Sequence, residues 1–332
     1  MKMRSSFVCI DGHTAGNPVR LIVGGAPVLR GATMSERRRH FIEEYDWILK
    51  GLMFEPRGHD MMSGGFILPP LSPDADAAIL FIETSGALPM CGHGSIGMIT
   101  FGLEHGLIRP RAEGRLTVEV PAGTLDVRYE RDGNKVKWVR FTNVPSFLHT
   151  RDLTIEDAEL GPLRFDIAYG GNFYAIVEPQ GAFAGIDTLG ADAIIRHSPR
   201  IRETINRAIE VAHPLDPSIR GVSHVMWAEP PVDGTARSAV FYGIKAIDRS
   251  PCGTGTSARL AQLVARGIVP PDGTLTHQSY IRSTFEARVE GHTQVGRFAA
   301  ILPSVQGSAY ATGYNQIWID DAEPFPEGFS VT

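Results

Sequence analysis

The chain has 332 residues, of which 43% are hydrophobic and 21% are charged. That length fits roughly two average domains or one large domain, and the composition excludes a disordered chain. The formal net charge is -5 and the pI is near 6.1. Because this balance provides no basic field, we expect no nucleic-acid partner.

No apolar run approaches the roughly 18 residues that a membrane-spanning helix needs, so no membrane partner is expected. The apolar patch within the first ten residues is too short for the core of a signal peptide. Three cysteines cannot form a disulfide framework, which indicates a reducing cytoplasm. Cys9 lies in an apolar run and is expected to be a small core residue.

In the first half of the chain, apolar periodicity predicts an amphipathic helix. Ser35 is its candidate N-cap, Gly51 lies past its end, and Arg37–Arg39 are expected on its solvated face. Further along, the patterns predict a strand at Ala77–Ile82 and a helix at Ser95–His105 that ends before Gly106. Three more strands are predicted, at Leu116–Val120, Thr124–Glu130 and Val136–Phe141.

Two short motifs occur twice, in the same order. Asp-x4-Gly-Asn occupies residues 11–17 and 166–172, an offset of 155, and Cys-Gly-x-Gly occupies residues 91–94 and 252–255, an offset of 161. Another glycine, Gly267, lies as far after Cys252 as Gly106 lies after Cys91. Three matches in one order at a nearly constant offset indicate an internal repeat.

The elements around the second cysteine repeat those around the first. An apolar run at Ala239–Ile247 precedes the motif, and a helix is predicted at about Thr256–Arg266. We therefore predict two similar α/β domains, 1–150 with the Cys91 loop and 151–309 with the Cys252 loop. The C-terminal segment, about 310–332, is expected to pack back on the first domain.

Each Cys-Gly-x-Gly motif stands at the expected mouth of a helix. The partial positive charge and unpaired N–H groups there favour a thiolate, so we predict a lowered thiol pKa. Glycines let the backbone approach a ligand closely, and its N–H groups suit a carboxylate. Two such loops predict that Cys91 and Cys252 face each other across one anionic substrate.

Two thiols on opposite sides of a carbon suit one reaction. Inverting a stereocentre requires that a proton leave one face and that another arrive at the opposite face, and a thiolate and a thiol do this in either direction. No dinucleotide fingerprint or pyridoxal phosphate lysine is recognisable. We therefore expect no cofactor, with the carbanion stabilised by the site itself.

Two other readings of the cysteines stay open. Zinc held by Cys91, His93 and Cys252 matches no familiar spacing, so no metal is expected. A Cys–His hydrolase has eleven histidines available, but it leaves the second loop without a role.

The residues around both loops resemble those of the proline racemase family. The match at residues 248–256 (DRSPCGTGT) is highly specific. Less specific matches cover nearly the whole chain, at residues 11–20 (DGHTAGNPVR), 55–64 (EPRGHDMMSG), 90–94 (MCGHG), 170–177 (GGNFYAIV) and 221–227 (GVSHVMW).

The resemblance implies a fold like that of diaminopimelate epimerase. This is an α/β (α+β) fold with two pseudo-symmetric domains, each wrapping a central helix, and an active site in the cleft between them. It also implies catalysis without a cofactor and assembly as a homodimer.

Carried over by position, the resemblance makes Cys91 and Cys252 the acid–base thiols. Backbone N–H groups would hold the substrate carboxylate, at Gly92, His93, Gly253 and Thr254. Two side chains would hold the ring nitrogen, those of Asp248 and His224.

Two further positions bear on the substrate. The resemblance implies that proline racemases have a phenylalanine at the position matching Ser63, where it packs on the substrate ring. Serine leaves room for a ring hydroxyl and a hydrogen bond to it. Tyr242, ten residues before Cys252, matches a second aromatic wall of the pocket.

We therefore expect epimerisation at Cα, from trans-4-hydroxy-L-proline to cis-4-hydroxy-D-proline. Racemisation of proline and dehydration of trans-3-hydroxy-L-proline are the alternatives within the family. Its dehydratases typically have threonine at the second cysteine position, which disfavours dehydration here. A non-enzymatic binder of cyclic amino acids is disfavoured because both cysteines are present.

Overall fold

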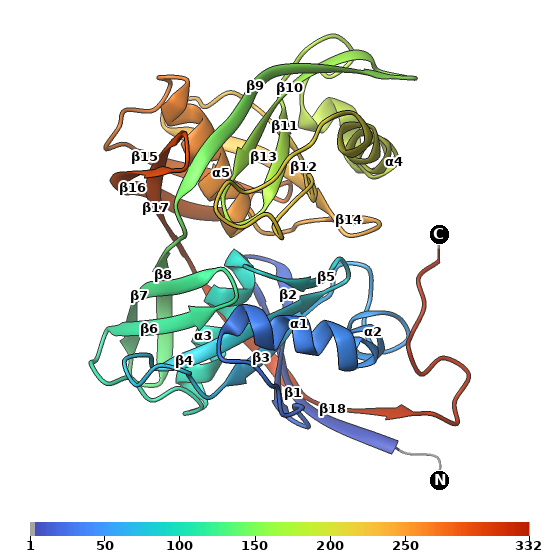
Figure 1. Ribbon diagram of the computed structural model, residues 1–332, viewed down its shortest axis with the longest axis vertical. Helices are drawn as coiled ribbons and strands as arrows, with labels where there is room; N and C mark the ends of the chain where they lie inside the picture. Colours follow the sequence, from blue (N-terminus) through green and yellow to red (C-terminus); the bar gives the residue numbers. More distant parts are fainter. Residues whose placement is uncertain (1–3, 332) are drawn as a thin grey trace. The chain divides into compact units, whose positions relative to one another are not determined.

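Figure 1 shows a computed structural model of the chain, which describes residues 4–331. The chain divides into two compact units. The first extends to Phe141 and includes the residues from Gly307 onward, and the second is Thr142–Gln306. Residue 150 lies within a strand of the second unit, β9 (Ser146–Asp157).

The first unit contains a mixed sheet. Its elements are β1 (Arg4–Thr14), β2 (Asn17–Gly24), α1 (Met34–Glu44), α2 (Asp46–Met53), β3 (Ser63–Leu68), β4 (Ala77–Glu83), β5 (Gly86–Leu88), α3 (Gly92–Glu104), β6 (Arg115–Val120), β7 (Gly123–Asp132), β8 (Lys135–Thr142, ending at the boundary) and β18 (Ala309–Asp320). Strands pair in the order β18-β1-β2-β3-β4-β6-β7, and only β2–β3 and β4–β6 are parallel among these described pairs. The first and last strands therefore lie side by side (Figure 1).

The second unit repeats this topology. Its elements are β9, β10 (Gly161–Tyr169), β11 (Phe173–Val177), α4 (Ile186–Ala208), β12 (His224–Ala228), β13 (Thr235–Tyr242), β14 (Ala246–Ile247), α5 (Gly253–Ala265), β15 (Thr274–Gln278), β16 (Thr284–Val295) and β17 (Phe298–Gly307, ending at the boundary). The order is β9-β10-β11-β12-β13-β15-β16-β17, with β11–β12 and β13–β15 parallel. Because β17 pairs with β9, these strands close into a barrel.

Each unit wraps a central helix, as expected. α3 is buried from Gly92 to Leu103 and packs against β1, β2, β3 and β18. α5 is buried from Gly253 to Leu263 and packs against β9, β10, β11 and β16. The mixed α/β fold with two pseudo-symmetric halves is thus confirmed.

The glycines predicted to end these helices do so by the same geometry. Gly106 and Gly267 have φ angles of 69° and 70°, in the left-handed region that favours glycine. The next N–H groups, of Leu107 and Ile268, donate to carbonyls five residues earlier at 2.8 and 2.9 Å. This is the hydrogen bond of a Schellman cap.

The helix expected from Ser35 to Gly51 is instead two helices, α1 and α2, interrupted at Tyr45 (φ -129°, ψ 15°). Thr33 is the N-cap, and its side chain accepts from the N–H of Glu36. Gly51 lies inside α2, where a Cβ would stand 2.3 Å from Ile319 Cδ1. That glycine serves close packing against β18, which the local sequence could not reveal.

Two smaller expectations also need correction. Arg37 and Arg38 are half-buried, and they donate to the backbone carbonyls of Pro69 and Ala87. Only Arg39 of this run is exposed. The apolar run expected as one strand at Ala239–Ile247 is divided between β13 and β14 by a turn.

Cys9 is a core residue, as predicted. Its side chain is fully buried on β1, and burial raises the pKa of its thiol to about 12. Between residues 4 and 331, no helix combines the length and apolar character needed to span a membrane.

The aspartates that begin the two Asp-x4-Gly-Asn motifs anchor their units through arginine. Arg20 donates to both carboxylate oxygens of Asp11, at 2.8 and 2.9 Å. Arg266 makes the same two-pronged contact with Asp166, at 2.6 Å for each bond. Burial by itself raises the pKa of Asp166, but hydrogen bonds from Arg266 and Gln262 outweigh it and lower that pKa below its usual value.

We predict that Asp166→Asn lowers the free energy of unfolding by about 3 kcal/mol, because it breaks a mostly buried ion pair. The folded-state pKa of Asp166 is lowered, so this stability is present at neutral pH and is lost as the pH falls below about 4. Urea unfolding of both proteins across this pH range measures it.

Asp152→Asn is the matched control, because Asp152 also binds Arg266 but its side chain is 52% exposed. Exposed pairs contribute at most about 1 kcal/mol. Equal losses in the two variants would contradict the role assigned to Asp166.

Candidate functional site

Both cysteines are helix N-caps. The sequence predicted helices from Ser95 and Thr256, but α3 and α5 begin earlier, directly after Cys91 and Cys252. The carbonyls of the cysteines accept the first helical hydrogen bonds, from Ser95 N–H at 2.9 Å and Thr256 N–H at 2.7 Å. The preceding N–H groups of each first turn have no acceptor within the helix. Each thiol therefore adjoins a set of backbone donors.

The second glycine of each Cys-Gly-x-Gly motif lets the sulfur fold over the first helical turn. A Cβ on Gly94 would lie 2.9 Å from Cys91 Sγ, and a Cβ on Gly255 would lie 3.1 Å from Cys252 Sγ. The Gly255 N–H donates to Cys252. Glycine recurs here because any side chain would press against the sulfur.

The first unit brings Ser63, Cys91, Gly92 and His93 together. Ser63, the first residue of β3, has its Oγ 3.8 Å from Cys91 Sγ. His93 Nδ1 lies 3.7 Å from the same sulfur. The side chains of Ser63, Cys91 and His93 are all nearly completely buried. A hydroxyl and an imidazole therefore contact this thiol.

The second unit surrounds its thiol with hydroxyl groups. Tyr174 Oη lies 3.3 Å from Cys252 Sγ, and Thr254 Oγ1 lies 3.9 Å from it. The two hydroxyl oxygens are 2.5 Å apart. Burial, with a smaller contribution from Cys252, raises the pKa of Tyr174 well above its usual value. The phenol is therefore a neutral hydrogen-bonding group beside the sulfur.

The loop before Cys252 holds a strained backbone. Cys252 has a φ of 65°, which costs a residue with a side chain about 1–3 kcal/mol. Its N–H donates to Ser250 Oγ at 3.1 Å, and that hydroxyl donates to Asp248 Oδ1 at 2.8 Å. Asp248 also accepts from the Ser250 N–H. Asp248 thus caps the loop and fixes the cysteine.

The predicted fall in thiol pKa is wrong for Cys252. Burial raises the pKa of this thiol, and the negative charge of Asp248 raises it further. Hydrogen bonds from Tyr174, Gly255 and Thr254 offset only part of the increase. The helix terminus alone does not decide the protonation state, because the same fold places the sulfur away from water and near a carboxylate.

His224 and Tyr242 belong to the same cluster as Tyr174. The His224 ring stacks on Tyr174 at 4.6 Å and lies nearly parallel to Tyr242 at 6.3 Å, between ring centroids. Its Nδ1 is 2.7 Å from Ser223 Oγ. His224 begins β12 as Ser63 begins β3, with the 161-residue offset that also separates the cysteines. The repeat therefore places Ser63 and His224 at equivalent positions.

Sequence reasoning missed several residues that support the thiols. Tyr174 and Ser250 lie inside motifs already singled out, but no contact could be assigned to them from spacing. His277 is fully buried between Thr256 Oγ1 at 2.7 Å and Ser238 Oγ at 2.9 Å, and burial lowers its pKa to about 3. This neutral histidine supports the first turn of α5 through its contact with Thr256.

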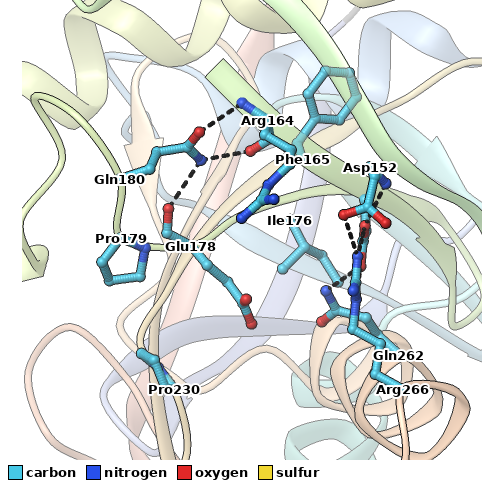
Figure 2. A pocket seen from close by; sticks show the side chains of 11 residues that line it. Asp152, Arg164, Phe165, Ile176, Glu178, Pro179, Gln180, Pro230, Gln262 and Arg266 are labelled. Carbon is cyan, nitrogen blue, oxygen red and sulfur yellow. Dashed lines mark hydrogen bonds and ion pairs between the residues drawn. The ribbon is translucent and has the colours of Figure 1, made fainter. Parts of the chain in front are cut away.

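Figure 2 shows a pocket of the second unit that contains none of the predicted site residues. Gln262 and Arg266 line it at the C-terminal end of α5, whereas Cys252 caps the N-terminal end. Of its charged lining groups, Arg266 pairs with both Asp152 and Asp166, and Glu178 pairs with Arg259. Across residues 4–331, no cluster of three or more His, Cys, Asp or Glu side chains is arranged to hold a metal ion.

The chain matches the sequence profile described as proline racemase over residues 9–330. A protein of Shewanella loihica named 4-hydroxyproline 2-epimerase is 54% identical over 331 residues, which are 99% of each chain.

Solved structures support the same relationship. A hydroxyproline epimerase from Agrobacterium vitis, solved with bound trans-4-hydroxy-L-proline, superposes with a TM-score of 0.90. It is 31% identical, and the match covers 98% of this chain and 95% of that one. A phenazine biosynthesis protein from Bacillus anthracis is only 15% identical, with a TM-score of 0.60 over 94% and 99% of the two chains. It shares the fold alone, in agreement with the diaminopimelate epimerase-like architecture.

We predict that Asp248→Asn lowers the pKa of Cys252, because it removes the carboxylate charge that helps to raise it. Since a raised pKa keeps the thiol protonated at neutral pH, the variant forms more thiolate there. Thiolate absorbance, taken as the difference from a matching Cys252→Ser protein at each pH, measures this change.

Asp187→Asn is the control, because Asp187 is an exposed carboxylate of the same unit that pairs with Arg237 and Arg282. We expect it to leave the thiolate titration of Cys252 unchanged. An unchanged titration in Asp248→Asn would contradict the electrostatic role of Asp248.

Proposed function

The chain belongs to the proline racemase family, and on this premise we propose that it interconverts trans-4-hydroxy-L-proline and cis-4-hydroxy-D-proline as an isomerase. One observation carries the proposal: a cysteine caps the central helix of each repeated unit. Two acid–base groups on opposite faces of Cα invert it, and the repeat supplies two of the same kind. The relative that is 54% identical is named for this activity.

In the proposed reaction, Cys91 and Cys252 act on opposite faces of Cα. The thiolate removes the Cα proton and becomes a thiol, while the other thiol delivers a proton to the opposite face and becomes a thiolate. The two cysteines exchange roles in each turnover, so the same pair serves both directions. Neither direction requires a redox partner, because no electrons leave the substrate.

Backbone N–H groups stabilise the charge that develops during proton removal. That charge spreads onto the substrate carboxylate, which suits the donors at a helix N-terminus. The donors are those of Gly92 and His93 in one unit and Gly253 and Thr254 in the other. Helix geometry leaves these groups without an acceptor inside their own helices.

Asp248 and His224 bind the ring ammonium, and this contact prepares Cys252 for catalysis. In the protein alone, the charge of Asp248 adds to burial in raising the pKa of the Cys252 thiol. A bound ammonium neutralises that charge, so the thiol becomes more acidic when substrate arrives. Substrate binding and proton transfer are therefore coupled through one carboxylate.

Ser63 favours hydroxyproline over proline. Its hydroxyl is buried and contacts the sulfur of Cys91, so a ring held at this thiol lies close to it. A site that hydrogen-bonds a substrate hydroxyl discriminates against the analogue lacking that group. Tyr242 supplies an aromatic wall beside His224. The proposal also includes a homodimer, and a reducing cytoplasm in which the three buried cysteines remain free thiols.

We predict that Cys91→Ser and Cys252→Ser each abolish epimerisation with little change in stability. A serine hydroxyl is far too weak an acid to exchange a Cα proton as a thiol does. Proton NMR in D₂O measures Cα exchange and the appearance of the cis-D epimer from trans-4-hydroxy-L-proline, and then the same exchange with L-proline.

Each outcome of this experiment is informative. Faster exchange with hydroxyproline supports the proposal, and exchange with proline alone would make the protein a proline racemase. Loss of water from trans-3-hydroxy-L-proline would identify a dehydratase. Binding of cyclic amino acids without exchange would leave only a binder.

We predict that Gly94→Ala lowers turnover by about 100-fold while the protein stays folded, because the new methyl group displaces the Cys91 sulfur. Gly313→Ala is the control in the same unit, since a Cβ there meets no atom within 4 Å. Steady-state kinetics with circular dichroism compare the two. Wild-type turnover in Gly94→Ala would show that sulfur placement is not critical.

A further inference from the structure

The asparagine that ends each Asp-x4-Gly-Asn motif contacts the residue two positions after the cysteine of its own unit. Asn17 Nδ2 lies 3.0 Å from His93 Nε2, and Asn172 Nδ2 lies 3.5 Å from Thr254 Oγ1. The two repeated motifs therefore meet in space, in both units. The proposed reaction gives the asparagines no role, although they lie one contact away from the thiols.

In the first unit these contacts determine which ring nitrogen of His93 carries the proton. The Asn17 Nδ2 group carries only hydrogens and donates, so His93 Nε2 is the acceptor and has no proton. A neutral imidazole then has its proton on Nδ1, which lies 3.7 Å from Cys91 Sγ. Asn17 is fully buried, and Thr14 Oγ1 donates to the His93 carbonyl at 2.8 Å. His93 is thus held at its ring by Asn17 and at its backbone carbonyl by Thr14.

We propose that Asn17 is a positioning residue that holds His93 as the Nδ1–H tautomer, so that the imidazole donates a hydrogen bond to Cys91 Sγ. The inference rests on the proposed function in taking Cys91 as an acid–base thiol. A donor facing the sulfur stabilises the thiolate relative to the thiol. His93 therefore contributes its side chain as well as its backbone N–H.

The second unit uses the equivalent asparagine differently. Asn172 donates to the Thr254 hydroxyl, which lies 2.5 Å from Tyr174 Oη beside Cys252. Hydroxyl hydrogens rotate, so these groups donate to a thiolate or accept from a thiol. Cys91 thus has one fixed side-chain donor, His93, besides the rotatable hydroxyl of Ser63, whereas both side-chain partners of Cys252 are hydroxyl groups that adjust to either protonation state.

The tautomer of His93 is read directly by ¹⁵N NMR of protein labelled at histidine nitrogen, with the His93 signals assigned by their loss in His93→Asn. We expect a protonated Nδ1 and an unprotonated Nε2 in the wild-type protein. In Asn17→Leu, which removes the amide donor, we expect a shift toward the Nε2–H tautomer. A wild-type His93 with its proton on Nε2 would overturn the proposal, whatever the turnover.

The consequence for the thiol is measured separately, from thiolate absorbance relative to the matching Cys91→Ser protein. In Asn17→Leu we expect the pKa of Cys91 to be about 1 higher, the usual worth of one hydrogen bond. His93→Leu should raise it similarly. His93→Asn should stay near wild type, because its amide N–H takes the place of Nδ1–H.

Asn172→Leu is the matched control, since it changes the equivalent asparagine of the other unit and should leave the Cys91 titration unchanged. If Asn17→Leu does not fold, the pair His93→Leu and His93→Asn decides the question. Equal pKa values in that pair would overturn the role of the imidazole donor. A wild-type protein that holds the Nδ1–H tautomer but does not epimerise hydroxyproline would instead count against the proposed function, and an unchanged tautomer in Asn17→Leu would overturn the role of Asn17.

Discussion

The close contact of a cysteine sulfur with the first turn of a buried helix is the constraint on which the site depends. It requires the cysteine as N-cap and a glycine three residues later, where a Cβ would come within about 3 Å of the sulfur. It also requires a helix enclosed by strands, and this enclosure buries the thiol away from water. Desolvation opposes ionisation, so each thiol needs hydrogen-bonding partners at short range, and the first turn of the helix and a neighbouring strand supply them.

Duplication explains why the halves share a framework, and under the proposed function the substrate explains why they differ. Strand order, parallel pairs and glycine caps recur in both units. The side chains around the sulfurs do not: Ser63 stands where the other unit has His224, and His93 where it has Thr254. In the proposed reaction each face of Cα is served by an acid–base thiol, but the proposed substrate carries an ammonium and a hydroxyl at different places. Equivalent positions therefore diverge while the cysteines are kept.

The aspartates of the two units have two different roles. The two partly buried aspartate–arginine anchors, Asp11–Arg20 and Asp166–Arg266, satisfy their carboxylates within each unit and stabilise the fold. Asp248 is different, because its loop contacts orient Cys252 while its charge raises the pKa of that thiol. In the proposed reaction the ligand brings a positive charge to this carboxylate, and binding then removes the electrostatic penalty on the thiolate.

The sequence by itself determined the repeat, the paired cysteine loops, the central helices with their glycine ends and the family, because these are written in local motifs and their spacing. Only the tertiary structure decided where α1 gives way to α2, why Gly51 lies inside a helix, and which way the pKa of Cys252 moves. It alone also revealed the contacts of Tyr174, Asn17 and His277. These depend on burial and on neighbours distant in sequence, and a local pattern carries no information about either.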